Sequence, residues 1–215
     1  TLGEERFALL YLCLAKENIF AHTPLEIKEA SIREEEAITK KFYNDYSNFK
    51  RALFRDLVKL NIKNEVFRTE LNRDDAERGK KNIKHHLFKK SQKLIDRFLF
   101  IFFAEDRGLL PPNSTMLILQ DWDKLKDLDV EVPLYERFKT YFNYLDTGRK
   151  GTDKKAEIFA YNGGLFKPDA ILDSLLISDA LLYEHAKNLS HYDFESQVDV
   201  NILGHIFENS LNEIE

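Results

Sequence analysis

The stretch NIKHHLFKKSQKLIDRFLFIFFAEDRG, residues 82–108, decides the fold class of this chain. Apolar residues recur along it at the spacing that places them on one face of a helix. They are Ile83, Leu87, Leu94, Phe98 and Phe102. The second half of the stretch is apolar on nearly every side, which predicts a helix in the centre of the core. Gly108 favours the position just after a helix, so we expect the helix over about residues 82–107.

The composition favours an all-α fold. Only 8 Gly and 5 Pro occur among 215 residues, which argues against a turn-rich β fold. Charged residues make up 32% of the chain, which suits a solvated helical exterior, and the 17 Phe predict a core rich in phenylalanine. We therefore expect a multi-helix bundle with at most a small β-hairpin near residues 158–166.

Charge and cysteine content bound the setting of the protein. A net charge of −5 gives no global reason to expect nucleic-acid binding, although a local basic face remains open to it. The single cysteine, Cys13, cannot form an internal disulfide, which favours a reducing compartment and a buried structural thiol. No apolar run reaches the roughly 20 residues that span a bilayer, so we expect a cytoplasmic protein.

Further helices are expected on both sides of this stretch. One short apolar helix is predicted over about residues 3–20. Capping signals at Thr23–Glu26 and Ser31–Glu34 then favour two helix starts, with the second helix over about residues 32–60. Residues 71–82 lack apolar periodicity and predict a loop, which divides the chain into helical parts at residues 1–72 and 73–215. The remaining helices are expected within residues 116–122, 133–145, 171–189 and 198–211.

A stripe of basic residues on the predicted helix at residues 82–107 is the strongest charge feature. His85, Lys89, Lys93 and Arg97 follow one another at i, i+4 spacing, and Lys90 flanks them. Such a face is able to neutralise the phosphates of a DNA backbone. The alternative is a solvated face, or one that pairs with acidic segments of the same chain. Residues 170–215 offer nine acidic residues for such pairing and one lysine.

Catalytic and metal-binding patterns are not found. The side chains of His85 and His86, adjacent on a helix, point about 100° apart and cannot converge on one ion. The letters EIK at residues 26–28 match part of a nuclease motif, but they lie on a predicted helix without the strand that the motif requires. Glu105 and Asp106 lie at a helix end that disfavours acids, so they are expected to have a partner, either Arg107 or a neighbouring helix end, and ion pairing is favoured over catalysis. We therefore expect no catalytic residue and no metal ligand.

The motif YNGGLF, residues 161–166, is interpreted as a structural corner. Asn162-Gly163 is a strong signal for a tight turn, and Gly164 permits a positive φ. Tyr161, Leu165 and Phe166 are expected to anchor the corner in the core. Valine at Gly163 or Gly164 is accordingly expected to cost stability.

Several blocks in order resemble one protein family. They read ITKKFYNDYSNFKRALFRDL, FKKSQKLIDRFLFIFFAEDRGLLP, YNGGLF and YDFESQVDVNILGHIFENSLNEIE. Together they resemble the helical connector of the type IIG restriction–modification enzymes, which fuse a restriction endonuclease to an adenine-specific DNA methyltransferase. Related phage-defence methyltransferases share these blocks. The resemblance covers roughly residues 38–215.

The resemblance implies a function for the parent protein and a different one for this chain. The parent is expected to cut DNA and to methylate adenine at N6, with S-adenosylmethionine and Mg²⁺. This chain has neither a Gly-rich cofactor motif nor an NPPY tetrad, so it is expected to bind no cofactor and to position the two modules. Residues 1–72 then form the tail of the nuclease side, and residues 73–215 lead into the methyltransferase. The expected partners are those two modules, with double-stranded DNA as a further one. The alternative is an independent helical scaffold for protein–protein interaction.

Overall fold

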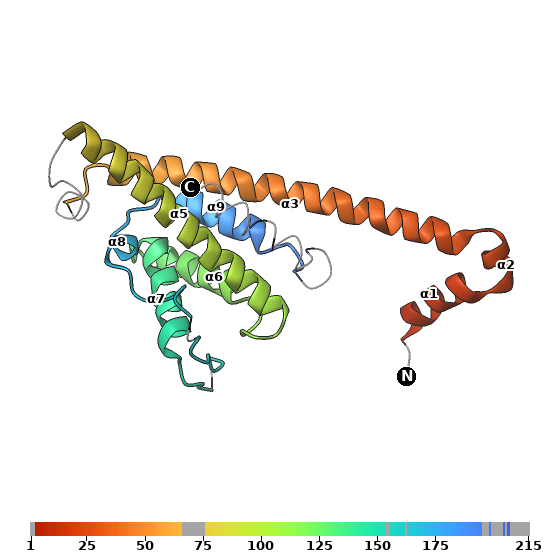
Figure 1. Ribbon diagram of the computed structural model, residues 1–215. Helices are drawn as coiled ribbons and strands as arrows, with labels where there is room; N and C mark the ends of the chain where they lie inside the picture. The colour runs from red at the N-terminus through yellow and green to blue at the C-terminus, as the bar shows by residue number, and fades with distance from the viewer. Residues whose placement is uncertain are drawn as a thin grey trace. The chain divides into compact units, whose positions relative to one another are not determined.

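The fold is all-α, as the sequence predicts. A computed structural model describes residues 3–65, 76–153, 155–161, 163–194, 198, 204 and 206, with the side chains of residues 76–82 excepted. The elements are labelled in Figure 1. They are α1 (Glu4–Leu14), α2 (Lys16–Phe20), α3 (Thr23–Asn61), α5 (Ala76–Asp106), α6 (Ser114–Asp127), α7 (Leu134–Thr147), α8 (Ala170–Asp173) and α9 (Asp179–Leu189). In the described part of the chain, no helix is long and apolar enough to cross a membrane.

The chain divides into two compact units, Thr1–Lys41 and Phe42–Glu215. Helix α3 contributes its first part to one unit and its second part to the other. The predicted boundary between residues 72 and 73 falls in a stretch, residues 66–75, that lies outside the described residues. That boundary therefore stays a prediction.

The first unit corrects the helix predicted over residues 3–20. Two helices, α1 and α2, replace it, because Ala15 adopts an extended conformation with φ −63° and ψ 134°. No glycine or proline marks this break, so periodicity alone does not reveal it. Neither helix buries a residue. Cys13 is accordingly part-exposed, and the expected buried thiol is not found.

Helix α3 begins within one residue of the first predicted start and runs without a break through the second. The carbonyl of His22, which has a φ of 61°, accepts hydrogen bonds from the amides of Leu25 and Glu26. His22 therefore takes the cap position expected for Thr23. Ser31 lies inside the helix, since no glycine or proline stops the chain from continuing through this second capping signal.

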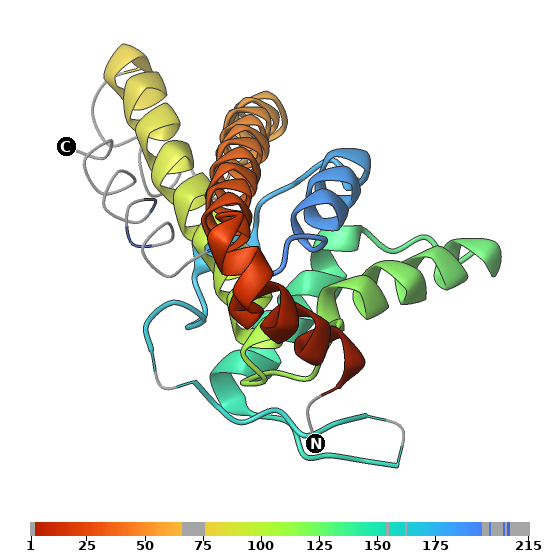
Figure 2. The ribbon, with the colours of Figure 1, turned by 90° about the vertical axis from the view of Figure 1, so that its right-hand side faces the viewer.

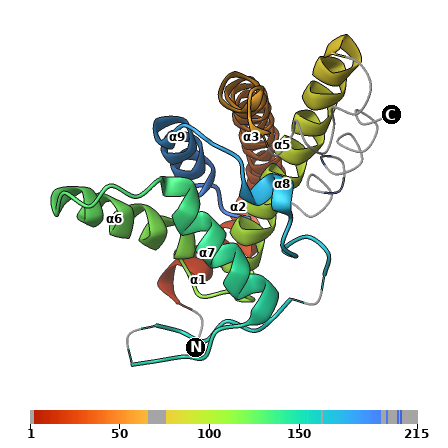
Figure 3. The ribbon, with the colours of Figure 1, turned by 90° about the vertical axis from the view of Figure 1, so that its left-hand side faces the viewer.

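Helix α5 is the centre of the second unit. Its predicted face is buried throughout, and Phe98 has no exposed surface. The Phe98 ring centroid lies 6.0 Å from that of Phe49 on α3 and 4.9 Å from that of Phe138 on α7. Phe194, which follows α9, contacts the rings of Phe42 and Phe102. The core is therefore rich in phenylalanine, as predicted, and Figure 3 shows how α8 also lies against α5.

The ends of α5 differ in how well they were predicted. The helix begins at Ala76, inside the loop expected over residues 71–82. It stops where expected, since Gly108 adopts a φ of 68° and donates its amide to the carbonyl of Glu105. Asn113, also left-handed, then precedes α6.

A short antiparallel pairing follows α7. Isolated bridges join Arg149 to Ile158 and Thr152 to Lys155, and the two arms run side by side in Figure 2. We call residues 148–160 the bridged segment. It overlaps the hairpin expected near residues 158–166 only near Ile158. The helix expected over residues 198–211 lies largely outside the described residues; within it, Val198 and Ile206 are buried.

Candidate functional site

The predicted basic stripe does not form one exposed face. His85 and Lys89 are exposed. Lys90 and Lys93 instead contact Asp169, with their Nζ atoms 2.5 Å and 3.3 Å from its Oδ2 atom. Asp169 directly precedes the acidic region at residues 170–215. Lys90 and Lys93 are therefore paired with an acidic residue of the same chain, which is the alternative to an exposed DNA-binding face.

Asp169 joins α5 to α8. Its Oδ1 atom accepts a hydrogen bond from the amide of Leu172 and caps the helix, while Oδ2 receives the two lysines. Burial raises the pKa of this carboxyl, but the hydrogen bonds from Lys90 and Leu172 outweigh it and hold the pKa at about 2. The carboxylate is therefore charged at neutral pH and bound on both of its oxygens.

Arg97 lies in the interior and corrects its expected place on the stripe. It is 1% exposed. Its Nε atom donates to the carbonyl of Leu165 at 2.8 Å, and its Nη2 atom donates to the carbonyl of Lys167 at 3.0 Å. The guanidinium lies 5.0 Å from the ring of Phe142, and burial lowers its pKa. Other elements surround α5 at this point, so Arg97, the last residue of the predicted stripe, contacts protein and not solvent.

The motif at residues 161–166 is the segment that Arg97 holds. Tyr161 donates its hydroxyl to the carbonyl of Leu109 and its amide to the carbonyl of Leu145. Phe166 is buried, and its ring lies 5.2 Å from that of Phe100. Leu165 is half-buried and contributes its carbonyl.

The glycines of this motif do not have the predicted role. Asn162 lies outside the described residues, so the predicted turn type stays a prediction. Neither Gly163 nor Gly164 has a positive φ, and a Cβ atom on either would meet nothing within 4 Å. The expected loss of stability on substitution by valine therefore has no steric or backbone basis at these two positions.

Of the two partners expected for the acidic pair at the end of α5, the neighbouring helix end describes Glu105, which binds the start of α6, and Arg107 does not. The Oε1 atom of Glu105 accepts hydrogen bonds from the amide of Thr115 at 3.0 Å and from its hydroxyl at 3.3 Å. Asp106 accepts the amide of Phe194 at 2.7 Å, and Arg107 is exposed over the Phe103 ring. Burial raises the pKa of Glu105 to about 7, against the opposing hydrogen bonds from Thr115.

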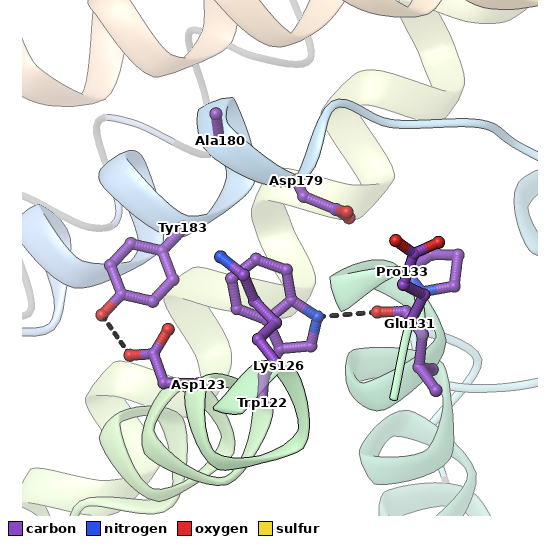
Figure 4. Close-up of a pocket in the computed structure, with 9 residues that line it drawn as sticks. Trp122, Asp123, Lys126, Glu131, Pro133, Asp179, Ala180 and Tyr183 are labelled. Carbon is purple, nitrogen blue, oxygen red and sulfur yellow. Dashed lines mark hydrogen bonds between the residues drawn. The ribbon is translucent and has the colours of Figure 1, made fainter. Parts of the chain in front are cut away.

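A cavity of about 920 Å³ surrounds Trp122 (Figure 4). The indole Nε1 atom donates to the carbonyl of Val132 at 2.7 Å, and the hydroxyl of Tyr183 donates to Asp123 at 2.8 Å. The ammonium of Lys126 lies 4.3 Å from the Trp122 ring centroid. A cation of the chain therefore already occupies the aromatic face that a cationic ligand would use.

A second cavity, of about 530 Å³, lies between α6, α7 and the bridged segment. Arg137, Tyr141 and Arg149 line it. These residues were not among those predicted from the sequence. The available signal was weak, because polar groups at Arg137 and Tyr141 lie one turn apart on a helix that otherwise reads as core-facing.

Within the described ranges, no three His, Cys, Asp or Glu side chains gather so that they could hold a metal ion. His85 and His86 have ring centroids 6.3 Å apart, at an interplanar angle of 83°. The two rings are not directed at a common ligand position.

Comparison with known proteins finds a distant similarity. The chain is 22% identical, over 239 aligned positions, to a protein of Methanocaldococcus jannaschii named "Putative type II restriction enzyme and methyltransferase RM.MjaORFECS2P". The match covers 96% of this chain and 19% of that protein, so the chain spans about a fifth of the relative's length. No protein-family model matches the chain, and no solved structure matches it. The similarity supports a loose relationship to restriction–modification proteins.

Arg97→Lys is expected to destabilise the second unit by about 2 kcal/mol, because lysine keeps the charge but cannot reach both carbonyls or stack flat on Phe142. Urea unfolding measures the loss. Arg107→Lys, the same change at an exposed arginine, is the control and is expected to leave the midpoint unchanged. Equal effects of the two substitutions would show that Arg97 has no special role.

Glu105→Gln is expected to change how stability depends on pH. The folded pKa of about 7 exceeds the ordinary 4.5, so the stabilisation from protonated Glu105 is complete below pH 4.5 and is lost as the pH rises through 7. Glutamine keeps an oxygen for the Thr115 amide and avoids that loss. Between pH 5 and pH 8 the variant should therefore gain up to about 3 kcal/mol relative to the wild type.

Chemical unfolding at a series of pH values measures this difference. Glu184→Gln, at an exposed position on α9, is the matched control and should run parallel to the wild type. The interpretation fails when Glu105→Gln also runs parallel to the wild type across the range.

Proposed function

We propose that this chain is the helical connector of a protein that combines a restriction endonuclease with an N6-adenine DNA methyltransferase. The observation that carries the proposal is the similarity along 96% of this chain to part of a much longer protein whose name contains both activities. A match of this form is expected when a domain joins others in one polypeptide. The similar segment covers 19% of that protein, which leaves room for catalytic modules elsewhere in it.

The packing of the second unit supports a role in positioning. Helix α5 contacts α3 through Phe49 and α7 through Phe138, and it holds the segment after the bridged segment through Arg97. A core of interlocked rings resists deformation, because interiors pack as densely as organic crystals. A connector with such a core holds its attached modules in a defined geometry.

Under this proposal the cofactors belong to the modules outside this chain. S-adenosylmethionine would bind in the methyltransferase and Mg²⁺ in the nuclease. The role of this chain is mechanical, since it sets the distance and orientation between the two catalytic sites. Both sites act on one DNA duplex.

A contact with the DNA backbone is a second element of the proposal. Arg97 is internal and Lys90 and Lys93 bind Asp169, so the contact rests on the N-terminal part of α5. Lys84, His85 and Lys89 are exposed there.

The rival function, a scaffold for protein–protein interaction, is favoured by one observation. Large apolar side chains are exposed on α1 and α2. They include Phe7, Leu10, Tyr11, Leu14 and Phe20. A surface of this kind marks an interface with another protein or domain. It is compatible with a nuclease module of the same polypeptide as well as with a separate partner.

Sequencing the gene on both sides of this segment tests the connector directly. We expect an Asp…Glu-x-Lys nuclease pattern upstream, and a Gly-rich motif followed by NPPY downstream. These patterns supply the carboxylates for Mg²⁺ and the site for the methyl donor. A reading frame that closes after residue 215 without a methyltransferase would instead favour the independent scaffold.

Titration of a short duplex with the chain at several salt concentrations tests the DNA contact. The double substitution Lys84→Glu and Lys89→Glu is expected to weaken binding and to flatten the dependence of log K on log salt by about 2, since each phosphate contact contributes about 0.9. Lys187→Glu, an exposed lysine on α9, is the control. Absence of binding at low salt, or equal binding by all variants, would refute the contact.

A further inference from the structure

The cavity between α6 and α7 has an unusual lining. Helix α7 places Arg137, Tyr141 and Tyr144 on one face toward it, at i, i+4 and i+7. The bridged segment closes another side with Arg149 and Lys155. The cavity volume of about 530 Å³ is in the range that holds a small ligand.

Three buried polar atoms at this cavity lack a hydrogen-bond partner. They are Arg137 Nε, Tyr141 Oη and Arg149 Nε, and they are three of only four such side-chain atoms in the described part of the chain. Tyr141 is 6% exposed, so its hydroxyl cannot turn to bulk solvent. Burial raises the pKa of this hydroxyl to about 12, and the nearby Ser114 side chain, whose own hydroxyl donates to the carbonyl of Pro111, opposes that rise. A buried donor without a partner costs about 1–3 kcal/mol, which makes three at one place a strong sign of a group that is supplied from outside.

One of the donors, Arg149, is held in place without a ligand. The Nη2 atom of Arg149 donates to the carbonyl of Ala156 at 2.7 Å, and its guanidinium lies 5.0 Å from the ring of Tyr144. These contacts fix the plane of the guanidinium and leave Nε unused. Tyr141 is anchored by its position within α7. A donor that is already fixed binds a ligand with a smaller entropic penalty.

The charge at the cavity selects an anion. Three cationic side chains line the cavity, those of Arg137, Arg149 and Lys155. Asp121 is the one carboxylate in the lining, and its Oδ1 atom lies 3.1 Å from the Nζ atom of Lys124. Ser114 at the first turn of α6 also lines the cavity, while the amide of Thr115, one residue further on, is already bound by Glu105.

We propose that this cavity binds a phosphate ester, with Arg137 Nε, Arg149 Nε and the Tyr141 hydroxyl donating to its oxygens. Donors from three side chains suit the several oxygens of a phosphate, whereas a carboxylate is satisfied by one arginine fork. Pro112, Leu117 and Ile118 provide an apolar wall for the organic part of the ester. The site is separate from the exposed residues of α5 and does not rest on the connector role.

Tyr141→Phe is the decisive variant. It removes an unsatisfied hydroxyl, so without ligand the variant should be at least as stable as the wild type. It also removes one of the three donors, so its affinity for phosphate should fall about tenfold, which corresponds to about 1.4 kcal/mol. A purely structural tyrosine would not combine these two effects.

The measurement is calorimetric titration of the chain with inorganic phosphate, deoxyadenosine monophosphate and a short duplex, alongside the shift of the unfolding midpoint. Arg137→Met should also lose affinity, and Tyr183→Phe, in the cavity around Trp122, should retain it. Binding of the mononucleotide but not of the duplex identifies a free nucleotide as the source. Binding of the duplex that Tyr141→Phe weakens identifies the DNA backbone.

Three results would overturn the proposal. The first is that none of the phosphate compounds binds or shifts the unfolding midpoint. The second is that acetate binds as tightly as phosphate, which would make the site a carboxylate site. The third is that Tyr141→Phe binds phosphate as the wild type does.

Discussion

The buried guanidinium of Arg97 is the interaction on which the second unit depends. It bridges two carbonyls, those of Leu165 and Lys167, from the centre of an otherwise apolar helix. Moving a charge into such a core is costly unless its donors are satisfied. Here the two carbonyls and the adjacent ring of Phe142 meet that requirement. The segment at residues 163–167 therefore has to lie where its carbonyls accept the hydrogen bonds of Arg97. Helix α5, which carries Arg97, sets that position.

The rest of the α5 surface follows from this constraint. Once Lys167 is fixed, Asp169 is brought within reach of Lys90 and Lys93. The same carboxylate then caps α8, so a single short segment receives three cations from one helix. Most of the basic residues that the sequence suggests as a DNA-binding face thus bind other residues of the same chain. Only the portion around Lys89 remains free to meet an external phosphate.

Local patterns predicted the features that depend on neighbouring residues. The buried face of α5, its stop at Gly108, and helices α6 and α7 follow from periodicity and from breaker residues. The burial of Arg97 does not, because its partners lie 68 and 70 residues away. The break at Ala15 and the continuation of α3 through Ser31 carry no distinctive residue either. The cavity at Tyr141 forms where α6, α7 and the bridged segment come together. The residue spacing within any one of these elements does not predict it.

Arg97 on the one hand, and Arg137 and Arg149 on the other, differ in how their buried nitrogen atoms are bonded. Arg97 meets the usual requirement of a charge in a core, because backbone oxygens accept both of its hydrogen bonds. Arg137 and Arg149 each leave Nε without a partner, although Arg149 finds one for Nη2 only 7 residues away. The chain supplies hydrogen-bond acceptors for the most deeply buried arginine, yet it supplies none for the Nε atoms of the two less buried ones. Their open donors, gathered with that of Tyr141 around one cavity, are therefore best explained by a ligand that completes them.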